Sequence, residues 1–439
     1  MKHQIKLILQ RQNKKPEIVL YYLFLALFLF FLPFNHTLVI RIGFPLKISE
    51  IAIIGLVSLS VVLYFRNRNF IYRNCIQFPS KYLYVLAAFF LLYFFSTVFN
   101  FFYAYPYTLD YYEKRFSIPI DSMLKCGYLL MSYSCFFLSY LAFKLNKTLF
   151  LKIYIAGAVA ASIYAWYLFS FSLLNLHYST LPGGVEHPQA ALFKFGHFIR
   201  AGSFKEGNLM GMFLVVSGII SIYAKKYKLS GFLFLTLITT ASSAAFFTTV
   251  LFFGGYFFHL FYHRRQYKKI LFFSLTSLFI FASLCISPDF RYMMAKFGLF
   301  PSKANADATF SKGERLNLAS VALNIGVDNF IVGVGPNNFA WHYTHYNKQE
   351  VYNHRETRMA ANNVYLEIFS ETGLISLMIF LLFLFFLLKK SFKHENKLLF
   401  GGLITILTYF FAYPTFTTLF IWVYFALILA HNENNTNNN

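Results

Sequence analysis

Charged residues are scarce in this chain: Asp, Glu, Lys and Arg make up 13% of it, while apolar residues make up 58%. A soluble globular protein carries roughly 25% charged and about 45–50% apolar residues. The sequence instead contains several apolar runs of about eighteen or more residues, the length that spans a bilayer as a helix. It lacks the roughly ten-residue alternating segments of a membrane barrel. We therefore expect an all-α polytopic membrane protein.

Cysteines are also few, and no pair has the spacing of a metal site. The four are Cys75, Cys126, Cys135 and Cys285. Two of them, Cys126 and Cys135, fall inside one apolar segment, as is typical of unpaired core or membrane thiols. We expect no disulfide framework, no metal site and no other cofactor.

Acidic residues number 17 against 39 Lys and Arg, which gives a formal net charge of +22. The basic residues are spread over many short loops, where they act as topology signals and face anionic lipid. The chain has no basic soluble domain with interleaved aromatic residues, so nucleic acid is not an expected partner.

A cleavable signal peptide is missing as well. The first apolar run, IVLYYLFLALFLFFLPF at residues 18–34, is longer than a signal's apolar region, and no small-residue cleavage site follows it. We interpret it as a retained first helix, preceded by a basic tail on the cytoplasmic side.

Basic clusters between the apolar runs indicate on which side of the membrane each predicted helix begins and ends. Single helices are expected over residues 17–34, 47–65, 82–102, 121–143, 149–176, 207–223, 270–287 and 362–388.

Two longer apolar blocks are expected to form hairpins. Residues 229–262 have basic clusters at both ends, so a turn near TTASSAAF keeps both clusters on one side. Residues 398–430 break at Pro414, which cannot continue a helix without losing a backbone hydrogen bond. The sum is a single integral membrane domain over residues 1–439 with about twelve transmembrane helices and both termini cytoplasmic. We expect residues 431–439 to form a polar, disordered cytoplasmic tail.

Two loops are expected on the opposite, periplasmic face, at residues 177–206 and 288–361. The second lies between predicted helices 9 (residues 270–287) and 10 (residues 362–388), and it is the largest region expected outside the membrane. It contains a helix-compatible segment with Ser311 and Glu314 at capping-box spacing, followed by the turn GVGPNNF. Because long loops in compact proteins usually carry function, we expect this face to be the working face.

One arginine stands in each of these loops: Arg200 closes the first, and Arg315 lies in the helical segment of the second. The planar guanidinium binds phosphate with two parallel hydrogen bonds and stays charged. Two arginines near one interface suit a pyrophosphate. The alternative for each is a solvated or snorkelling interfacial side chain.

Three motifs follow one another along the chain: RAGSFKEGNLMGMFL at 200–214, ERLNLASVALNIGVDNFIVGVGPNNF at 314–339 and NNVYLEIFSETGLISL at 362–377. In this order they resemble the motifs of the bacterial O-antigen ligase and O-antigen polymerase superfamily. The first is similar to the family's first arginine motif, with Gly211 at the spacing described for polymerases. The second resembles its second arginine helix and turn, and the third resembles its following block. The early RIGFPLKISEIAII is also similar.

The resemblance implies a multi-pass protein of the bacterial inner membrane that transfers a glycan from undecaprenyl pyrophosphate to an acceptor at the periplasmic face. Arg200 and Arg315 would hold the pyrophosphate and offset its developing charge. No metal or nucleotide sugar is needed. The implied partners are the lipid-linked oligosaccharide, an acceptor glycan, the bilayer and a membrane protein that regulates chain length.

One departure concerns the catalytic base. Ligases of the family place a His where this chain has Asn362, and an Asn side chain cannot accept a proton near neutral pH. The candidates to replace this base are Glu206 and His354. The alternative for Glu206 is an ion pair with Lys205 or Arg200 that has no part in catalysis. A solvated surface is expected for His342 and His345 rather than a metal site.

Further residues are expected to bind substrate or to shape the site. They are Lys205, Asn208, Lys125, Gly335, Asn337 and Asn363. For Gly333 and Gly335 the alternative role is to permit a tight turn. For Lys125 it is snorkelling to the interface.

Because Asn362 replaces the ligase His, the sequence favours a polymerase of lipid-linked repeat units over a ligase acting on the lipid A core. Transfer of the glycan to protein is a third alternative within the class. A transporter without chemistry would place charges at the bilayer midplane or show paired broken helices in matching halves. We find few intramembrane charges and no internal repeat.

Overall fold

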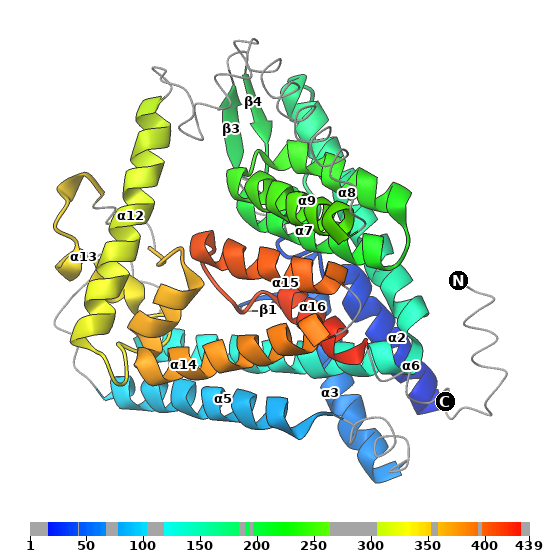
Figure 1. Ribbon diagram of the computed structural model, residues 1–439, viewed down its shortest axis with the longest axis horizontal. Coiled ribbons are helices and arrows are strands. Elements are labelled where there is room, and N and C mark those ends of the chain that lie inside the picture. The colour runs from blue at the N-terminus through cyan, green and yellow to red at the C-terminus, as the bar shows by residue number, and fades with distance from the viewer. Residues whose placement is uncertain are drawn as a thin grey trace.

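The computed structural model describes residues 16–42, 44–66, 78–102, 118–183, 189–193, 196–263, 305–352, 359–393 and 397–431. Two expectations, the helix at 270–287 and the tail from 432 onward, lie outside these residues. Figure 1 shows the helices packed side by side and crossing one another, with two short β-ribbons.

Most single helices begin and end within three residues of their expected bounds, because apolar runs and basic flanks fix where each one leaves the membrane. They are α2 (Pro16–Phe31), α3 (Ile48–Arg66), α5 (Ser80–Phe101) and α7 (Gly207–Tyr223). The expected helices at 121–143 and 149–176 form α6 (Ile118–Leu173), which is interrupted by non-helical backbone at Asn146. The Asn146 side chain accepts a hydrogen bond from the backbone N–H of Leu149 at 3.0 Å and so caps the second half.

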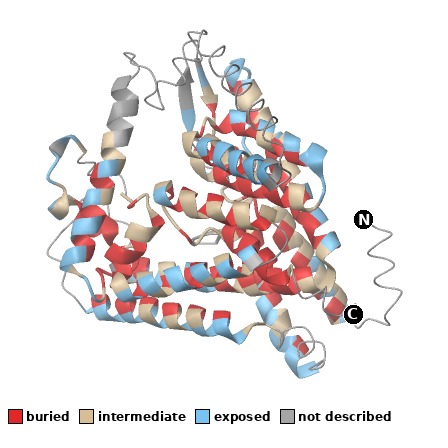
Figure 2. Cartoon of the chain, viewed as in Figure 1, coloured by how far each residue is buried: buried red, intermediate tan, exposed pale blue. Residues whose placement is uncertain are grey.

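Both blocks expected to form hairpins consist of two helices with a break between them, but the two helices of each block pack mainly on other helices rather than on each other. The first is α8 (Tyr227–Thr240) and α9 (Ser243–His263), joined at Ala241, whose φ of 44° lies in the left-handed region. The second is α15 (Lys397–Tyr409), a 3-10 turn η2 (Phe410–Ala412) and α16 (Leu419–Ala430). Pro414 lies in the non-helical break between η2 and α16. Helix α16 is buried along nearly its whole length, so it forms the centre of the bundle (Figure 2).

Within the described residues, four helices are long and apolar enough to cross a membrane by length and composition. They are Ile48–Arg66, Ser80–Phe101, the kinked Ile120–Leu173 and Val364–Phe392. Both helices of each block, together with α2 and α7, contribute shorter apolar stretches. The protein is therefore a helical membrane protein.

The fold is not helical throughout, because two antiparallel ribbons interrupt it. Strands β1 (Val39–Ile42) and β2 (Phe44–Lys47) form the first ribbon. Strands β3 (Ala190–Phe193) and β4 (Gly196–Ile199) form the second, inside the first expected outer loop. These four-residue strands are too short to give a periodic signal in the sequence.

The larger expected loop contains α12 (Asn305–Asp328), α13 (Phe339–Tyr346) and a 3-10 turn η1 (Glu350–Tyr352). The capping box expected at Ser311 and Glu314 is wrong: the helix begins six residues earlier, so Ser311 lies in its interior. The segment NADATF before it is compatible with a helix and extends the first turn. A small apolar cluster joins α12, α13 and the turn between them; it includes Leu318, Val321, Ile325, Val334 and Phe339.

Helix α14 (Val364–Lys393) is broken at Gly373, whose φ is 81°. At this break the backbone N–H of Leu374 donates to the carbonyl of Phe330, in the turn that follows α12. A Cβ at position 373 would lie 2.2 Å from the carbonyl oxygen of Ile331, so only glycine fits there. The break thus fixes the end of α12 against the first turns of α14.

Candidate active site

Arg200 follows directly on β4 and is held by the β-ribbon. Its backbone N–H donates to the carbonyl of Gln189 at 3.0 Å. The side chain of Gln189 in turn accepts a hydrogen bond from the N–H of Gly207 at 2.9 Å. The ribbon therefore places Arg200 over the first residue of α7.

The side chain of Asn208 is hydrogen-bonded to the guanidinium of Arg200. Its Oδ1 accepts hydrogen bonds from Nη2 of Arg200 at 3.1 Å and from the hydroxyl of Ser242 at 3.0 Å. The hydroxyl of Tyr409 donates to the backbone carbonyl of Asn208 at 2.8 Å and lies 3.3 Å from the Ser242 hydroxyl. Four elements thus meet here: the segment after β4, the start of α7, the start of α9 and the end of α15.

Arg315 approaches this group from α12. Its charge interacts with that of Arg200, and both arginines interact electrostatically with the hydroxyl of Tyr409. Burial lowers the pKa of Arg200, Glu206 and Tyr409 oppose that shift, and Arg315 adds to it. Two arginines from segments far apart in the sequence are therefore near enough for their charges to act on each other.

The Nε atom of Arg200 is buried and has no hydrogen-bond partner among the described residues. A buried donor of this kind costs free energy unless a ligand or another group binds it. Helices α7 and α9 both begin beside Asn208, and a helix N-terminus carries partial positive charge. The arrangement suits an anion with several oxygen atoms.

Lys205 and Glu206 are the two residues directly before α7, and they differ in exposure. Glu206 is half-buried and interacts with Arg200. Lys205 is exposed, and its charge acts on His36, where burial is the main cause that lowers the pKa of His36 to about 4. Of these two candidates, Glu206 lies near Arg200, and the charge of Lys205 acts on His36.

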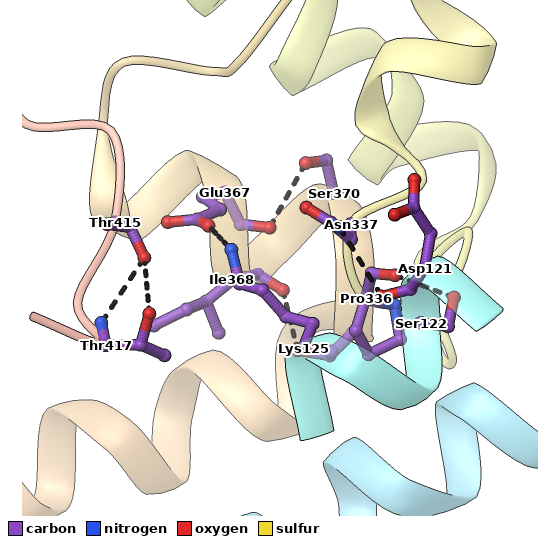
Figure 3. Close-up of polar contacts among 11 residues, drawn as sticks. Asp121, Ser122, Lys125, Pro336, Asn337, Glu367, Ile368, Ser370, Thr415 and Thr417 are labelled. Carbon is purple, nitrogen blue, oxygen red and sulfur yellow. Dashed lines mark hydrogen bonds and ion pairs between the residues drawn. The ribbon is translucent and has the colours of Figure 1, made fainter. Parts of the chain in front are cut away.

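A second polar group surrounds Lys125, which forms a buried ion pair with Glu367 of α14 (Figure 3). Only 11% of the Lys125 side chain and 5% of the Glu367 side chain are exposed. Lys125 is therefore not a snorkelling interfacial lysine. Its partner Glu367 was not among the residues expected to form a site.

The turn GVGPNNF packs against the same helices. Gly333 and Gly335 have φ angles of 72° and 94°, which confirms their role in a tight turn. The N–H of Gly335 donates to the carbonyl of Glu371 at 2.8 Å, and the side chain of Asn337 donates to the carbonyl of Asp121 at 3.4 Å. Here the two candidates, Gly335 and Asn337, join the turn to α14 and α6.

The remaining candidates lie at the start of α14. Asn363 caps this helix, because its Oδ1 accepts from the N–H groups of Tyr365 and Leu366 at 3.0 and 3.1 Å. Asn362 adopts a left-handed φ of 51°, a conformation that Asn tolerates better than most residues. His354 lies outside the described residues.

The two histidines of α13 differ in exposure. His345 is exposed, as expected, but His342 is buried, and burial is the main cause that lowers its pKa to about 4. The expected solvated surface is thus wrong for His342, because α13 folds back onto α12. No group of three His, Cys, Asp or Glu residues that could hold a metal occurs within the described ranges.

Four contributors to these groups escaped the sequence analysis: Gln189, Ser242, Tyr409 and Glu367. The first three act through contacts between distant segments, which no local pattern reveals. Glu367 carried one signal, since it is a carboxylate near the start of an apolar helix, where an unpaired charge is costly.

Residues 229–381 match the family model described as O-antigen ligase. The match begins after Arg200 and includes α8, α9, α12 with Arg315, the glycine turn and the first half of α14. No curated protein matches the chain. Over these residues the chain is similar to the O-antigen ligase family, which supports the resemblance of the ordered motifs around both arginines to the O-antigen ligase and polymerase superfamily.

Proposed function

We propose that this protein is a glycosyltransferase that takes its glycan from undecaprenyl pyrophosphate and passes it to a hydroxyl of an acceptor. The observation that carries this proposal is the buried Nε of Arg200 at the start of α7, together with the electrostatic interaction of Arg200 with Arg315 and with the hydroxyl of Tyr409. The family match supports a lipid-linked glycan as the substrate class.

The charges at this site favour a diphosphate. The carboxylate of Glu206 interacts with Arg200, and the like charges of Arg200 and Arg315 disfavour each other. A bound pyrophosphate would offset this repulsion and accept hydrogen bonds from Nε of Arg200 and from the start of α7.

The lengths of α8 and α15 suggest how deep the site lies. Helix α8 has 14 residues and α15 has 13, so each rises about 20 Å from the basic segment that precedes it. The hydrocarbon core of a bilayer is about 30 Å thick. If both basic segments are cytoplasmic, Ser242 and Tyr409 lie inside the outer leaflet. A carrier lipid could then present its pyrophosphate to the arginines without leaving the membrane.

In this account the reaction is a single displacement on the periplasmic side of the inner membrane. The acceptor oxygen forms a bond to the anomeric carbon, and the bond from that carbon to the pyrophosphate oxygen breaks. The electron pair remains on the pyrophosphate, where Arg200 and Arg315 stabilise the added charge. The acceptor proton passes to a base.

Glu206 is the first candidate for that base, because it is half-buried beside Arg200. His354 is the second candidate. Replacement of Glu206 by Gln tests the first assignment: a loss of about 100-fold or more in kcat is expected of a general base. Unchanged turnover removes Glu206 and leaves His354.

Polymerisation of repeat units is our first assignment, since Asn362 cannot serve as the ligase base. Ligation to the lipid A core is the second candidate, favoured by the description of the family model. Surface-glycan gels of Arg200→Ala and Arg315→Ala cells distinguish the two. Loss of long chains with one repeat retained indicates a polymerase, and loss of every repeat indicates a ligase. A normal glycan profile in either variant contradicts the proposed function.

A further inference from the structure

A buried group of hydrogen bonds holds α12 two residues away from Arg315. Nδ2 of Asn317 donates to the hydroxyl of Tyr343 in α13 at 3.0 Å and to Oδ1 of Asn347 at 2.9 Å. The hydroxyl of Tyr343 donates in turn to the backbone carbonyl of Tyr352 in η1 at 2.8 Å. Both Asn317 and Tyr343 are buried. The single hydroxyl of Tyr343 therefore connects α12, α13 and η1.

The segment between α13 and η1 follows the same side of α12. Asn347 fixes its path, because its side chain accepts from the N–H of Gln349 at 3.1 Å and donates to the carbonyl of Gln349 at 3.0 Å. The hydroxyl of Tyr352 then lies against Gly313, about one helical turn before Asn317, where a Cβ would collide with it. This segment thus contacts α12 at both Gly313 and Asn317.

Arg315 points to a different side of α12. At 3.6 residues per turn, two successive positions differ by about 200°, so the side chains of Arg315 and Asn317 leave the helix about 160° apart. Gly326, about three full turns after Arg315 and therefore on its side, packs against the ring of Phe369 in α14. The segment from α13 to η1 and the helix α14 thus hold α12 from two sides, and Arg315 lies on the α14 side.

Hydrogen bonds are needed to fix the rotation of α12. The apolar cluster that joins α12 to α13 is small and is separate from the main core. Apolar burial has no preferred direction, whereas a hydrogen bond requires a particular distance and angle. A rotation of α12 would move Arg315 relative to Arg200, and a displacement of about 1 Å at a reacting site costs up to about 100-fold in rate.

We propose that Asn317 and Tyr343 are positioning residues, which set the rotation of α12 so that Arg315 meets the pyrophosphate; this inference rests on the proposed function. In this account neither side chain contacts the substrate. Their effect passes through the guanidinium of Arg315, so it should disappear when that group is removed. A general contribution to folding would not depend on Arg315 in this way.

Titration of the purified full-length protein in lipid nanodiscs with farnesyl pyrophosphate tests the proposal. The stoichiometry of binding reports how much protein is folded, and the affinity reports the geometry of the site. Tyr343→Phe keeps the ring and removes only the hydroxyl, and Asn317→Ala removes the donor to that hydroxyl. We expect each variant to lower the affinity by about fivefold, with the stoichiometry unchanged, since one hydrogen bond is lost.

Tyr424→Phe is the matched control. Tyr424 is also fully buried, and its hydroxyl donates to the backbone carbonyl of Leu399 at 2.8 Å, the same length as the bond from Tyr343 to Tyr352. This bond joins α16 to α15 and does not involve α12. The control loses an equivalent hydrogen bond and should bind farnesyl pyrophosphate as the wild type does.

Double variants show whether the effect passes through Arg315. In the Arg315→Ala background, Tyr343→Phe should lower the affinity no further. In the Arg200→Ala background, it should still lower the affinity by about fivefold, because Arg315 remains. An equal loss in both backgrounds would mean that Tyr343 acts on the fold in general, and the positioning role would be wrong.

The outcomes keep this inference apart from the proposed function. Wild-type affinity in both Tyr343→Phe and Asn317→Ala, together with a loss in Arg315→Ala, would overturn the positioning role alone. Wild-type affinity in Arg315→Ala itself would overturn the proposed function, whatever the other variants do.

Discussion

Gly207 lies directly against the side chain of Arg200. A Cβ at position 207 would be 2.4 Å from Nε of Arg200 and 2.6 Å from the backbone oxygen of Thr240. The absence of a side chain at the first residue of α7 therefore allows the guanidinium to pack over the helix N-terminus.

Gly207→Ala should consequently displace Arg200, because the carbonyl of Thr240 in α8 cannot move as easily as a side chain. We expect a loss of at least about tenfold in donor affinity, the effect of removing one hydrogen bond to a charged group. Titration with farnesyl pyrophosphate measures it.

Gly254→Ala provides the control for this change. Gly254 is a helical glycine of α9, and a Cβ there meets no atom within 4 Å. This variant should bind as the wild type does and should be slightly more stable, since Ala favours a helix. Equal behaviour of the two alanine variants would show that the contact with Gly207 does not position Arg200.

Asn208→Asp tests the charge requirement of the site. The substitution keeps the size of the side chain but places a carboxylate 3.1 Å from Nη2 of Arg200, where it would compete with the phosphate groups. We expect the KM for the donor to rise by about tenfold or more. Asn208→Ser keeps a neutral oxygen and should be affected less. Steady-state kinetics with equal KM values for both variants would contradict this role of Asn208.

The sequence predicted the membrane class, the bounds of most helices and the breaks within the two longer apolar blocks, because apolar length, basic flanks and Pro414 are local signals. That Arg200 and Arg315 bind one ligand together stays a prediction, although their charges act on each other. The ribbons, the kink at Gly373 and the partner of Lys125 could not be predicted, because they depend on contacts between segments far apart in the chain. The capping box at Ser311 was wrong because the residues before it, NADATF, are themselves compatible with a helix and belong to α12.

His342 gives the stability of the protein a pH dependence. Burial lowers its pKa from 6.5 to about 4 in the folded protein, so the folded state binds this proton less readily than the unfolded chain does. Stability should therefore fall as the pH decreases from about 6.5 toward 4, by about 1.4 kcal/mol for each pKa unit of difference. Below about 4 both states are protonated, and the decline from this residue should stop.

Thermal unfolding in detergent between pH 4 and 7 measures this effect. His342→Gln should flatten the pH dependence, whereas His197→Gln, at an exposed position on β4, should leave it unchanged. A pH profile that is the same for wild type and His342→Gln would contradict the assignment.

The central claim is that Arg200 and Arg315 bind one diphosphate together. The most direct measurement is the affinity of the purified protein for farnesyl pyrophosphate in the wild type, in each single alanine variant and in the double variant. We predict a loss of about tenfold or more for each single variant. We also predict that the effects are not independent, since groups that contact one ligand and each other are coupled. Wild-type affinity in either single variant would contradict the account.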